Sequence, residues 1–411
     1  MIFLPFRALR PAPEYAAEIA APPYDVVSRE EARRLAEGNP RSFLRISRPD
    51  LEFPDTVAPT DPAIYRRAAE RLRQFMDERW LRRDKEPSFF FYRLQAATHT
   101  QWGIVGTCDV TDYENRTIRR HERTRAEPEE DRTRHTAAID ANAGPVWLFW
   151  EDEEGWADSW RGVESDAPLY DMVRPDGVRH TIWRVSDVDP MTEHFSRVKK
   201  SYIADGHHRA AAAARVAAMR RAANPRHNGT EEYNRFLAVL FPADGLRIAP
   251  YNRLVRDLGS LSKKGFLDAV SASFEIRRAQ GPWPSAPGRI AMYLGKNWSE
   301  LSRPPEPAAD PVARLDVSVL QEHLLAPILG IRDPRQDARL MCVGGAQSAQ
   351  ELARRVDAGE GAVAFSLRPV SVRQLMAVAD ADLTMPPKST WFEPKLLSGL
   401  LIHPLDSAIA R

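Results

Sequence analysis

The stretch Tyr202–Val216, YIADGHHRAAAAARV, decides both how this chain folds and where its function is sought. A short apolar run ends at Asp205, a glycine follows, and nearly pure alanine then predicts a helix. Strand, glycine turn and helix in this order are typical of an α/β fold. The first N–H groups of a helix have no partner within it, and the helix dipole is positive at that end. The junction therefore predicts an anion-binding site.

The residues at this junction suit phosphate chemistry. Gly206 allows a close backbone approach or a positive φ, and Arg209 supplies a planar guanidinium for phosphate oxygens. Asp205 could hold Mg²⁺ or cap the helix, while His207 and His208 could donate to a phosphate or relay protons. From the residues alone, a plain helix N-terminus stays an equal alternative, with Asp205 as N-cap and both histidines on the surface.

A zinc site is a third interpretation of the same junction. Adjacent helical residues point about 100° apart, so His207 and His208 do not share one helix face. A hydrolytic metal centre would also need one or more of three distant histidines to converge there, namely His121, His135 and His180. The sequence therefore favours phosphate over zinc.

Composition limits the class of protein. The 411 residues predict two domains, and 58 Lys+Arg against 57 Asp+Glu give a net charge of +1. This balance does not support broad binding to nucleic acid or to anionic membranes. No apolar run approaches the ~20 residues needed to span a bilayer, so we expect no membrane insertion. Cys108 and Cys342 lie far apart behind a start that is unlike a signal peptide, and we expect free thiols in the cytoplasm. A homodimer is among the oligomeric states that the sequence allows.

Helical and strand patterns alternate along the chain, which predicts an α/β fold with α+β mixed sheets. Ser28 and Glu31 predict a capping box, and residues 61–81 and 317–330 predict long helices. The pattern of predicted helices and strands changes near Leu261, which predicts domains over 1–258 and 259–411. The segment 385–402 could return from the second domain to the site, and MPPKSTWFEPKLLSGLLIH predicts a proline turn followed by a strand.

A second candidate site is APPYDV, residues 21–26. Its two prolines fix the backbone ahead of Tyr24 and Asp25. Asp25 is therefore a candidate general base or metal ligand, and Tyr24 is a candidate substrate contact. The alternative is that Asp25 is only a turn residue ahead of Ser28.

Two further motifs could contact phosphate. In RRHERTR, residues 119–125, Arg123 could bind a phosphate with Glu122 orienting it, although such charged runs are usually solvated loops. In MPPKST, residues 385–390, Lys388 could be a point-charge contact or a surface lysine of a turn. No GxxxxG precedes it, so this motif is not a Walker A loop.

Together these motifs resemble a known family. PFRAL, APPYDV, HERT, ADGHHRAAAA and MPPKSTWFEPKLLSGL stand in the order found in the bacterial and archaeal family catalogued as domain of unknown function 1015. The resemblance covers essentially the whole chain. The DGHHR element is also similar to one in ParB/sulfiredoxin-like proteins that phosphorylate free L-serine. This implies a ParB/sulfiredoxin-like core with a large insertion, acting as a small-molecule kinase.

The implied reaction transfers phosphate from a nucleotide, ATP or ADP, to the hydroxyl of free L-serine and gives O-phospho-L-serine. The free-serine kinases use a glutamate base near the N-terminus, whereas the rigid acid here is Asp25, and Glu30 and Glu31 look like first-turn residues of a helix. The residues expected at the site are Asp25, Asp205 and His207 for catalysis, Gly206, His208, Arg209, Arg123 and Lys388 for nucleotide phosphates, Tyr24 and Glu122 for the substrate, and Asp205 for Mg²⁺.

Two other classes of function stay open at this point. One is a ParB-like protein that binds a nucleotide and switches state without kinase turnover. The balanced charge and the absence of a recognisable helix-turn-helix segment weigh against its DNA-binding form. The other is a metal-dependent hydrolase that uses the histidine pair.

Overall fold

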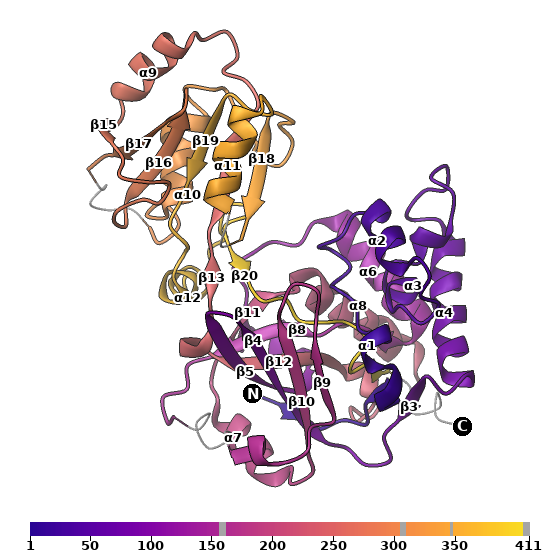
Figure 1. Cartoon of the computed structure of the whole chain (residues 1–411). Helices are drawn as coiled ribbons and strands as arrows, with labels where there is room; N and C mark the ends of the chain where they lie inside the picture. Colours follow the sequence, from indigo (N-terminus) through magenta and orange to yellow (C-terminus); the bar gives the residue numbers. More distant parts are fainter. Residues whose placement is uncertain (156–161, 305–309, 346–347, 406–411) are drawn as a thin grey trace. The chain divides into compact units, whose positions relative to one another are not determined.

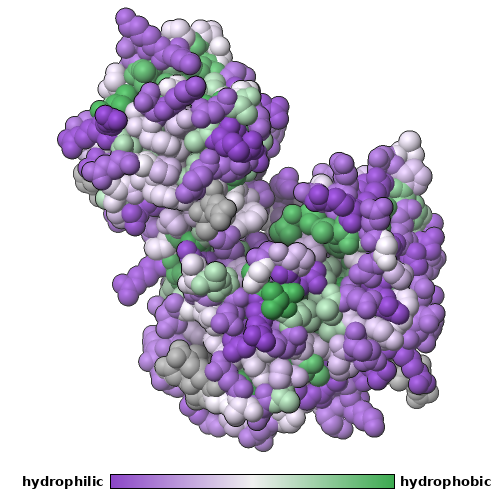
Figure 2. Space-filling model, viewed as in Figure 1, coloured by the Kyte–Doolittle hydropathy of each residue, from purple (hydrophilic) through white to green (hydrophobic). Residues whose placement is uncertain are grey.

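The computed structural model describes residues 1–155, 162–304, 310–345 and 348–405. The chain forms two compact units, Met1–Leu246 with Pro394–Arg411, and Arg247–Glu393. Strands and helices alternate in both (Figure 1), which confirms the mixed α/β class. No helix within the described ranges is long and apolar enough to cross a membrane. Hydrophilic residues cover most of the face drawn in Figure 2.

The first unit holds β1 (Phe3–Leu4), β2 (Leu9–Pro11), α1 (Ala16–Ile19), α2 (Arg29–Ala36), α3 (Leu44–Ser47), α4 (Pro62–Asp77), β3 (Leu81–Arg83), β4 (Phe89–Ala96), β5 (His99–Asp109), α5 (Val110–Glu114), β6 (Ile118–Arg119), α6 (Ala126–Ile139), β7 (Ala141–Asn142), β8 (Val146–Trp150), β9 (Tyr170–Val173), β10 (Arg179–Val185), α7 (Asp189–Arg197), β11 (Ser201–Asp205), α8 (His207–Ala223), β12 (Arg235–Pro242) and β21 (His403–Pro404). The second unit holds β13 (Ile248–Ala249), β14 (Tyr251–Val255), α9 (Lys263–Ser271), β15 (Glu275–Arg278), β16 (Arg289–Leu294), β17 (Asn297–Ser302), α10 (Asp316–Leu320), β18 (Leu340–Gly344), α11 (Ser348–Asp357), β19 (Val363–Ser366), α12 (Val372–Asp380) and β20 (Trp391–Phe392).

The main sheet of the first unit has the strand order β6-β11-β8-β12-β5-β4-β10-β9, with β1 added against β5. Two neighbouring pairs, β6 with β11 and β8 with β12, are parallel. The alanines of α8 explain how this helix packs on the sheet: Ala210, Ala213 and Ala217 are buried in the same core as Phe236 and Trp150. Small side chains bring the helix backbone close to the sheet, so the N-terminus of α8 is held firmly at the end of β11.

A second core of the first unit joins its N-terminal helices to the returning end of the chain. Phe43, Leu72 and Phe75 are buried there together with Ile402. A strand does follow the predicted proline turn, but it consists only of the two residues of β20, and the two-residue strand β21 forms separately. Gly399 interrupts the extended run at φ +88, where an added Cβ would lie 2.6 Å from Phe43 Cγ.

The second unit is built on a six-stranded sheet of order β15-β17-β16-β19-β14-β18. Strand β14 ends before the domain boundary predicted at residue 258, but it pairs with β18 and β19 and so belongs to this unit. The helix predicted over 317–330 begins with α10 and continues as a π-helical segment, Gln321–Leu325. Both cysteines are free.

Candidate functional site

The N-terminus of α8 lies directly after β11. Gly206 is its N-cap residue, in the left-handed conformation at φ 96 and ψ 28, and it has no side chain that could accept from the first N–H groups of the helix. The alternative of Asp205 as N-cap is therefore wrong, because the Asp205 carboxylate turns to Lys395 and Arg209 instead. The first N–H groups of α8 are left for another acceptor.

A second helix begins at the same end. Strands β6 and β11 are parallel, and each leads into a helix, α6 and α8. At the start of these helices Arg125 N–H donates to His208 Nε2 (3.1 Å), and at their far end Arg220 Nη2 donates to Asp140 Oδ1 (2.7 Å). The two helices thus run side by side in one direction, and the positive ends of both dipoles meet near Asp205. The two helix N-termini lie side by side because β6 pairs with β11, and β6 is a two-residue strand that the sequence pattern does not reveal.

Asp205 is surrounded by positive charge. Its Oδ2 lies 3.4 Å from Lys395 Nζ and 3.4 Å from Arg209 Nη2, and its side chain is 27% exposed. Burial raises the pKa of Asp205, but the charges of Lys395 and Arg209 outweigh burial and hold this pKa below the ordinary value. Asp205 is therefore a carboxylate at neutral pH.

Lys395 is a site residue that the sequence interpretation missed, although it belongs to the motif that supplied Lys388. Lys388 lies in the second unit, at φ 55, with Nζ 5.8 Å from the centroid of the Tyr251 ring. Its carbonyl oxygen accepts from Arg253 Nη2 (3.0 Å), so a buried arginine fixes this turn. The phosphate contact predicted for Lys388 stays a prediction.

The guanidinium of Arg209 lies against the glycine turn. Its side chain is 12% exposed and donates from Nη1 to the carbonyl oxygen of Pro145. A Cβ added at Gly206 would lie 3.0 Å from Arg209 Nε. Glycine is therefore required at this position both by its positive φ and by the close approach of Arg209.

The first histidine of the pair is buried. His207 is 5% exposed, its Nδ1 lies 3.8 Å from Glu122 Oε2, and its ring meets that of His121 edge to face at 4.6 Å. The alternative of surface histidines is thus wrong for His207. Burial lowers the pKa of His207 well below its ordinary value and lowers the pKa of His121 to about 4. Both rings are therefore neutral at pH 7.

These neutral rings keep unused hydrogen-bonding capacity. His207 Nε2 and His121 Nδ1 are buried without a hydrogen-bond partner among the described residues. His208 differs, because its Nε2 accepts the N–H of Arg125. Burial also lowers the pKa of His208. None of the three rings supplies a positive charge to the site, but each can form a directed hydrogen bond.

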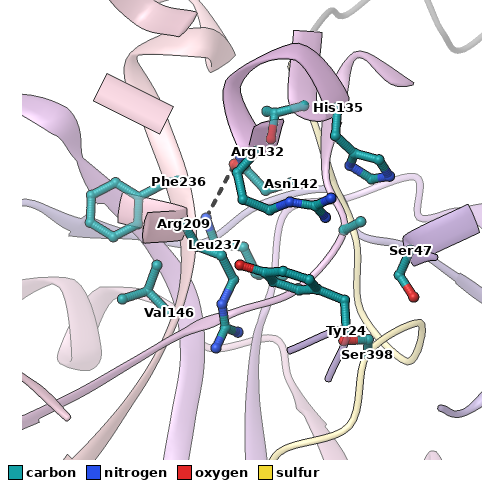
Figure 3. Close-up of a pocket in the computed structure, with 13 residues that line it drawn as sticks. Tyr24, Ser47, Arg132, His135, Asn142, Val146, Arg209, Phe236, Leu237 and Ser398 are labelled. Carbon is teal, nitrogen blue, oxygen red and sulfur yellow. Dashed lines mark hydrogen bonds between the residues drawn. The ribbon is translucent and has the colours of Figure 1, made fainter. Parts of the chain in front are cut away.

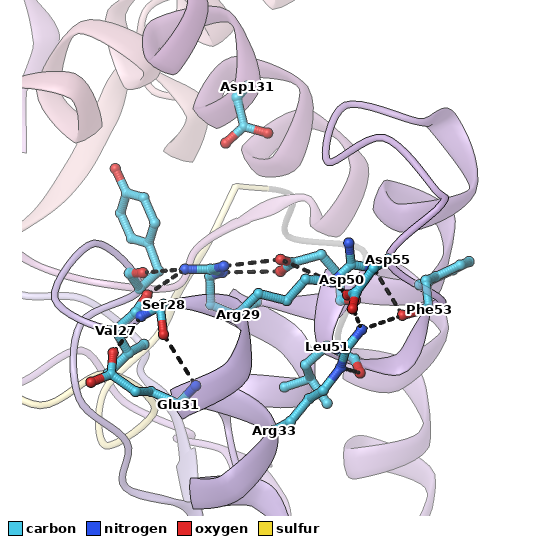
Figure 4. A network of polar contacts seen from close by, with 12 residues as sticks. Val27, Ser28, Arg29, Glu31, Arg33, Asp50, Leu51, Phe53, Asp55 and Asp131 are labelled. Carbon is cyan, nitrogen blue, oxygen red and sulfur yellow. Dashed lines mark hydrogen bonds and ion pairs between the residues drawn. The ribbon is translucent and has the colours of Figure 1, made fainter. Parts of the chain in front are cut away.

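The loop that carries Tyr24 is held by an arginine that the sequence interpretation missed. Arg48 donates from Nη1 to the carbonyl oxygens of Tyr24 (3.0 Å) and Val27 (2.6 Å). Its Nε and Nη2 bind the carboxylate of Asp50, which lies in the polar network of Figure 4. The prolines alone therefore do not account for the rigidity of this loop.

Asp25 is exposed and acts electrostatically on the first turn of α8. Its charge acts on His208 and Arg209, and burial together with the Asp25 charge raises the pKa of Tyr24 to about 12. Arg123 and Glu122 are exposed on the loop ahead of α6, where Glu122 lies beside His207. The structure thus brings Tyr24, Asp25 and the junction residues into one neighbourhood.

Tyr24 and Arg209 share a pocket within the first unit. Figure 3 shows Tyr24 between the guanidinium groups of Arg132 and Arg209, and the Arg132 Cζ lies 4.1 Å from the centroid of the Tyr24 ring. The pocket is lined by Tyr24, Ser47, Arg132, His135, Thr136, Asn142, Ala143, Gly144, Val146, Arg209, Phe236, Leu237 and Ser398.

The donor groups fit a lightly coordinated metal better than a zinc centre. Among the described residues, no three His, Cys, Asp or Glu side chains are grouped so that they could hold a metal ion. His135 bonds to the carbonyl oxygen of Ile46 and His180 to Tyr92, and only His121 meets His207. Asp205 offers the oxygen chemistry of a Mg²⁺ ligand, and Mg²⁺ usually takes one or two carboxylates together with substrate phosphates.

Comparisons with known proteins give distant structures and one family. Free serine kinase in complex with AMP is 11% identical, with a TM-score of 0.37, over 72% of this chain and 91% of that chain. SbnI with a C-terminal truncation, from Staphylococcus aureus, is 11% identical, with a TM-score of 0.38, over 75% and 89%. A conserved hypothetical protein from Pyrococcus furiosus is 11% identical, with a TM-score of 0.36, over 72% and 94%.

A search of curated protein sequences gives no match. The model of one family, described as protein of unknown function (DUF1015), matches residues 3–318, which is most of the chain. The motifs around Tyr24, His121 and Arg209 all fall within this match, and the chain belongs to the DUF1015 family.

Proposed function

We propose that this chain is a small-molecule kinase that transfers a phosphoryl group from ATP or ADP to the hydroxyl of free L-serine, giving O-phospho-L-serine. The observation that carries the proposal is the uncapped N-terminus of α8, which has a left-handed Gly206 and lies beside Arg209 and Lys395. The similarity of the DGHHR element to that of free-serine kinases supports the same reaction.

The phosphates of the nucleotide would bind at the paired helix N-termini. Backbone N–H groups of α8, the guanidinium of Arg209 and the ammonium of Lys395 supply positive charge from fixed positions. Phosphoryl transfer depends mainly on such positioning and charge neutralisation. Asp205 would hold Mg²⁺, which when bound neutralises charge on the transferred phosphate.

The chemical step needs a base for the serine hydroxyl. Asp25 is the candidate, because it is exposed and its charge acts on Arg209 and His208. As the serine Oγ–P bond forms, the hydroxyl proton goes to the Asp25 carboxylate and the bond between phosphorus and the bridging oxygen of the nucleotide breaks. The electron pair of that bond stays on the leaving nucleotide, ADP from ATP or AMP from ADP, whose charge Arg209 and Lys395 would stabilise.

The buried histidines would orient the donor. His207 is neutral and is fixed between Glu122 and His121, so it can hold one hydrogen bond to a phosphate oxygen in a set direction. We expect the enzyme to act in the cytoplasm, where its nucleotide donor is.

The test is a direct assay on the full chain. Purified protein with Mg²⁺, L-serine and either ATP or ADP should produce O-phospho-L-serine, followed by phosphorus NMR. D-serine and L-threonine in parallel define the acceptor. Folded protein that binds nucleotide but yields no phosphorylated amino acid with either donor would overturn the kinase and leave a nucleotide-binding switch.

A further inference from the structure

The chain around Lys395 forms neither a helix nor a strand, so hydrogen bonds to other elements set its place. Leu397 N–H donates to Tyr92 Oη (3.3 Å). The next residue, Ser398, exchanges two backbone hydrogen bonds with Ala21 (2.9 and 3.1 Å). Of these contacts, the bond to the Tyr92 hydroxyl is the nearest to Lys395 along the chain.

Tyr92 is itself fixed by a second side chain. Its Oη lies 2.8 Å from His180 Nδ1, and both side chains are 2% exposed. Because the N–H of Leu397 can only donate, Tyr92 Oη accepts this bond and its hydroxyl proton goes to His180 Nδ1. Burial lowers the pKa of His180 to about 4, so this ring is neutral at pH 7 and can accept at Nδ1. The three groups thus form a buried chain of hydrogen bonds in which each donor has its acceptor.

Tyr92 lies on the same face of the main sheet as Asp205. Asp205 is paired with Trp147 across β11 and β8, and the Trp147 ring contacts that of Phe241 in β12 (5.2 Å between centroids). The Phe241 ring lies over Gly103 in β5, where an added Cβ would be 2.7 Å from its Cζ. Gly103 is paired with Tyr92 in β4. Since paired residues point to the same face of a sheet, a continuous row of side chains joins Tyr92 to the acid at the helix junction.

The distance across this row leaves the chain little slack. The order β11-β8-β12-β5-β4 puts four strand spacings between Asp205 and Tyr92, or about 19 Å at about 4.8 Å each. Lys395 and Leu397 are two residues apart, which spans at most about 7 Å of extended chain. The Tyr92 and Lys395 side chains must bridge the rest, and the Lys395 ammonium is 3.4 Å from Asp205 Oδ2. A shift of the backbone at Leu397 would therefore be passed on to this ammonium.

We propose that Tyr92, held by His180, is a positioning residue that sets the place of Lys395 beside Asp205. The use of Lys395 as a phosphate contact rests on the proposed function. Tyr92 touches neither the nucleotide nor the acceptor and acts only through the backbone of Leu397. Without its hydroxyl a buried N–H would lose its acceptor, and a shift of the chain that relieves this loss would move Lys395 away from Asp205.

The first experiment measures the place of Lys395 without any ligand. Trace acetylation of the folded full chain with acetic anhydride, followed by mass spectrometry, gives the reactivity of each lysine. In the wild type Lys395 should react slowly, because its side chain is 20% exposed and paired with Asp205. Tyr92→Phe should raise the acetylation rate of Lys395 at least about threefold and leave that of the exposed Lys85 unchanged. Equal rates for Lys395 in the two proteins would overturn the proposal.

The second experiment separates positioning from a general loss of stability. Tyr170→Phe is the matched control, because Tyr170 is also buried in this sheet and its hydroxyl donates to the carbonyl oxygen of Pro11. We expect ADP affinity, measured by isothermal titration, to fall about three- to tenfold in Tyr92→Phe and to stay unchanged in Tyr170→Phe. In the Lys395→Ala background, Tyr92→Phe should cause no further loss, since its effect passes through Lys395. Additive losses would show that Tyr92 acts independently of Lys395 and would contradict the proposal.

Two variants of His180 test the hydrogen bond that holds Tyr92. His180→Asn can place a side-chain oxygen near the position of Nδ1 and accept from the Tyr92 hydroxyl, whereas His180→Leu cannot. We expect the acetylation rate of Lys395 to stay within about twofold of wild type in His180→Asn and to rise further in His180→Leu. The same rate in both variants would remove His180 from the proposal.

The two proposals fail differently. If Tyr92→Phe raises the reactivity of Lys395 but the wild-type chain forms no phosphoserine, the positioning role stands and the kinase falls. If phosphoserine forms and Tyr92→Phe changes neither the acetylation of Lys395 nor kcat/KM for the nucleotide, the kinase stands and Tyr92 does not position Lys395.

Discussion

Helices α2 and α8 both follow a loop motif, yet their N-termini are built in opposite ways. At α2, Ser28 Oγ accepts the N–H of Glu31 (3.2 Å) and Glu31 Oε2 accepts the N–H of Ser28 (2.8 Å), as Figure 4 shows for these side chains. At α8, Gly206 offers no side chain, and Arg209 and Lys395 gather at the terminus. One terminus satisfies its donors within the chain, whereas the other keeps them for a ligand.

The two helix N-termini thus have different uses: the N-terminus of α2 stabilises its helix, and that of α8 is open to a ligand. A capping box stabilises a helix by about 1 kcal/mol and leaves little for an anion to bind. The glycine terminus gives up that stabilisation, adds a positive φ and buries two neutral histidines beside it.

The largest effect should come from Asp205→Asn. The amide keeps the shape of the side chain, but it removes the charge that Lys395 and Arg209 face and replaces one carboxylate oxygen, a candidate Mg²⁺ ligand, by an NH2 group. We expect turnover to fall by about 10³ or more with the fold retained. Steady-state kinetics beside circular dichroism measures both, and wild-type turnover in this variant would remove Asp205 from the mechanism.

Lys395→Ala should have the next largest effect. It removes one of the two cations that lower the pKa of Asp205, and with it a charge for the phosphates. We expect kcat/KM for the nucleotide to fall by roughly 10–100-fold. Lys85→Ala, at an exposed lysine of the same unit, controls for the change in net charge.

Lys388→Ala then compares the two lysines of one motif. We expect kcat/KM for the nucleotide to fall less in Lys388→Ala than in Lys395→Ala. A larger fall in Lys388→Ala would favour Lys388 as the phosphate contact and would contradict the role proposed for Lys395 beside Asp205.

A pair of glycine variants separates backbone strain from site geometry. Gly206 (φ +96) and Gly229 (φ +91) share a positive φ, but only Gly206 has Arg209 within 4 Å of an added Cβ. Both changes to Ala should lower the free energy of unfolding by about 1–2 kcal/mol. Nucleotide affinity, measured by titration, should fall about tenfold only in Gly206→Ala. Equal affinities in the two variants would show that the α8 terminus does not contact the nucleotide.

The buried histidines predict a smaller, pH-dependent effect. His121 has a pKa of about 4 in the folded chain against 6.5 for the free side chain, and His207 is shifted in the same direction. As pH falls from about 6.5 to about 4, the unfolded chain takes up protons that the folded chain does not, so stability decreases across this window. Each such histidine contributes up to about 1.4 kcal/mol per pH unit. Urea unfolding of wild type and His121→Gln should show a shallower acid slope in the variant, and equal slopes would contradict the burial of a neutral ring.

Much of the local structure could be predicted from the sequence because it depends on neighbouring residues. The capping box at Ser28, the amphipathic helix α4 and the turn at Gly206 all follow from short patterns, and all three are present. The strand predicted after the proline turn is present, but it ends after the two residues of β20, and in the segment that follows Gly399 packs against Phe43, a residue distant in sequence.

The parts of the site that depend on distant contacts could not be predicted. Lys395 reaches Asp205 only because the end of the chain returns to the first unit, and Arg48 holds Tyr24 through backbone carbonyls that carry no sequence signal. The neutrality of His207 depends on burial beside His121, which requires the pairing of β6 with β11. The motifs thus identify most of the candidate site residues, whereas their contacts and protonation states depend on the fold.

The most direct test of the account is how nucleotide affinity depends on phosphate. Adenosine, AMP and ADP are titrated into the wild-type chain, Gly206→Ala and Ser28→Ala. The account predicts that wild type and Ser28→Ala bind ADP at least about tenfold more tightly than adenosine, and that Gly206→Ala loses this difference. Equal affinity of the wild-type chain for adenosine and ADP would contradict a phosphate site at the N-terminus of α8.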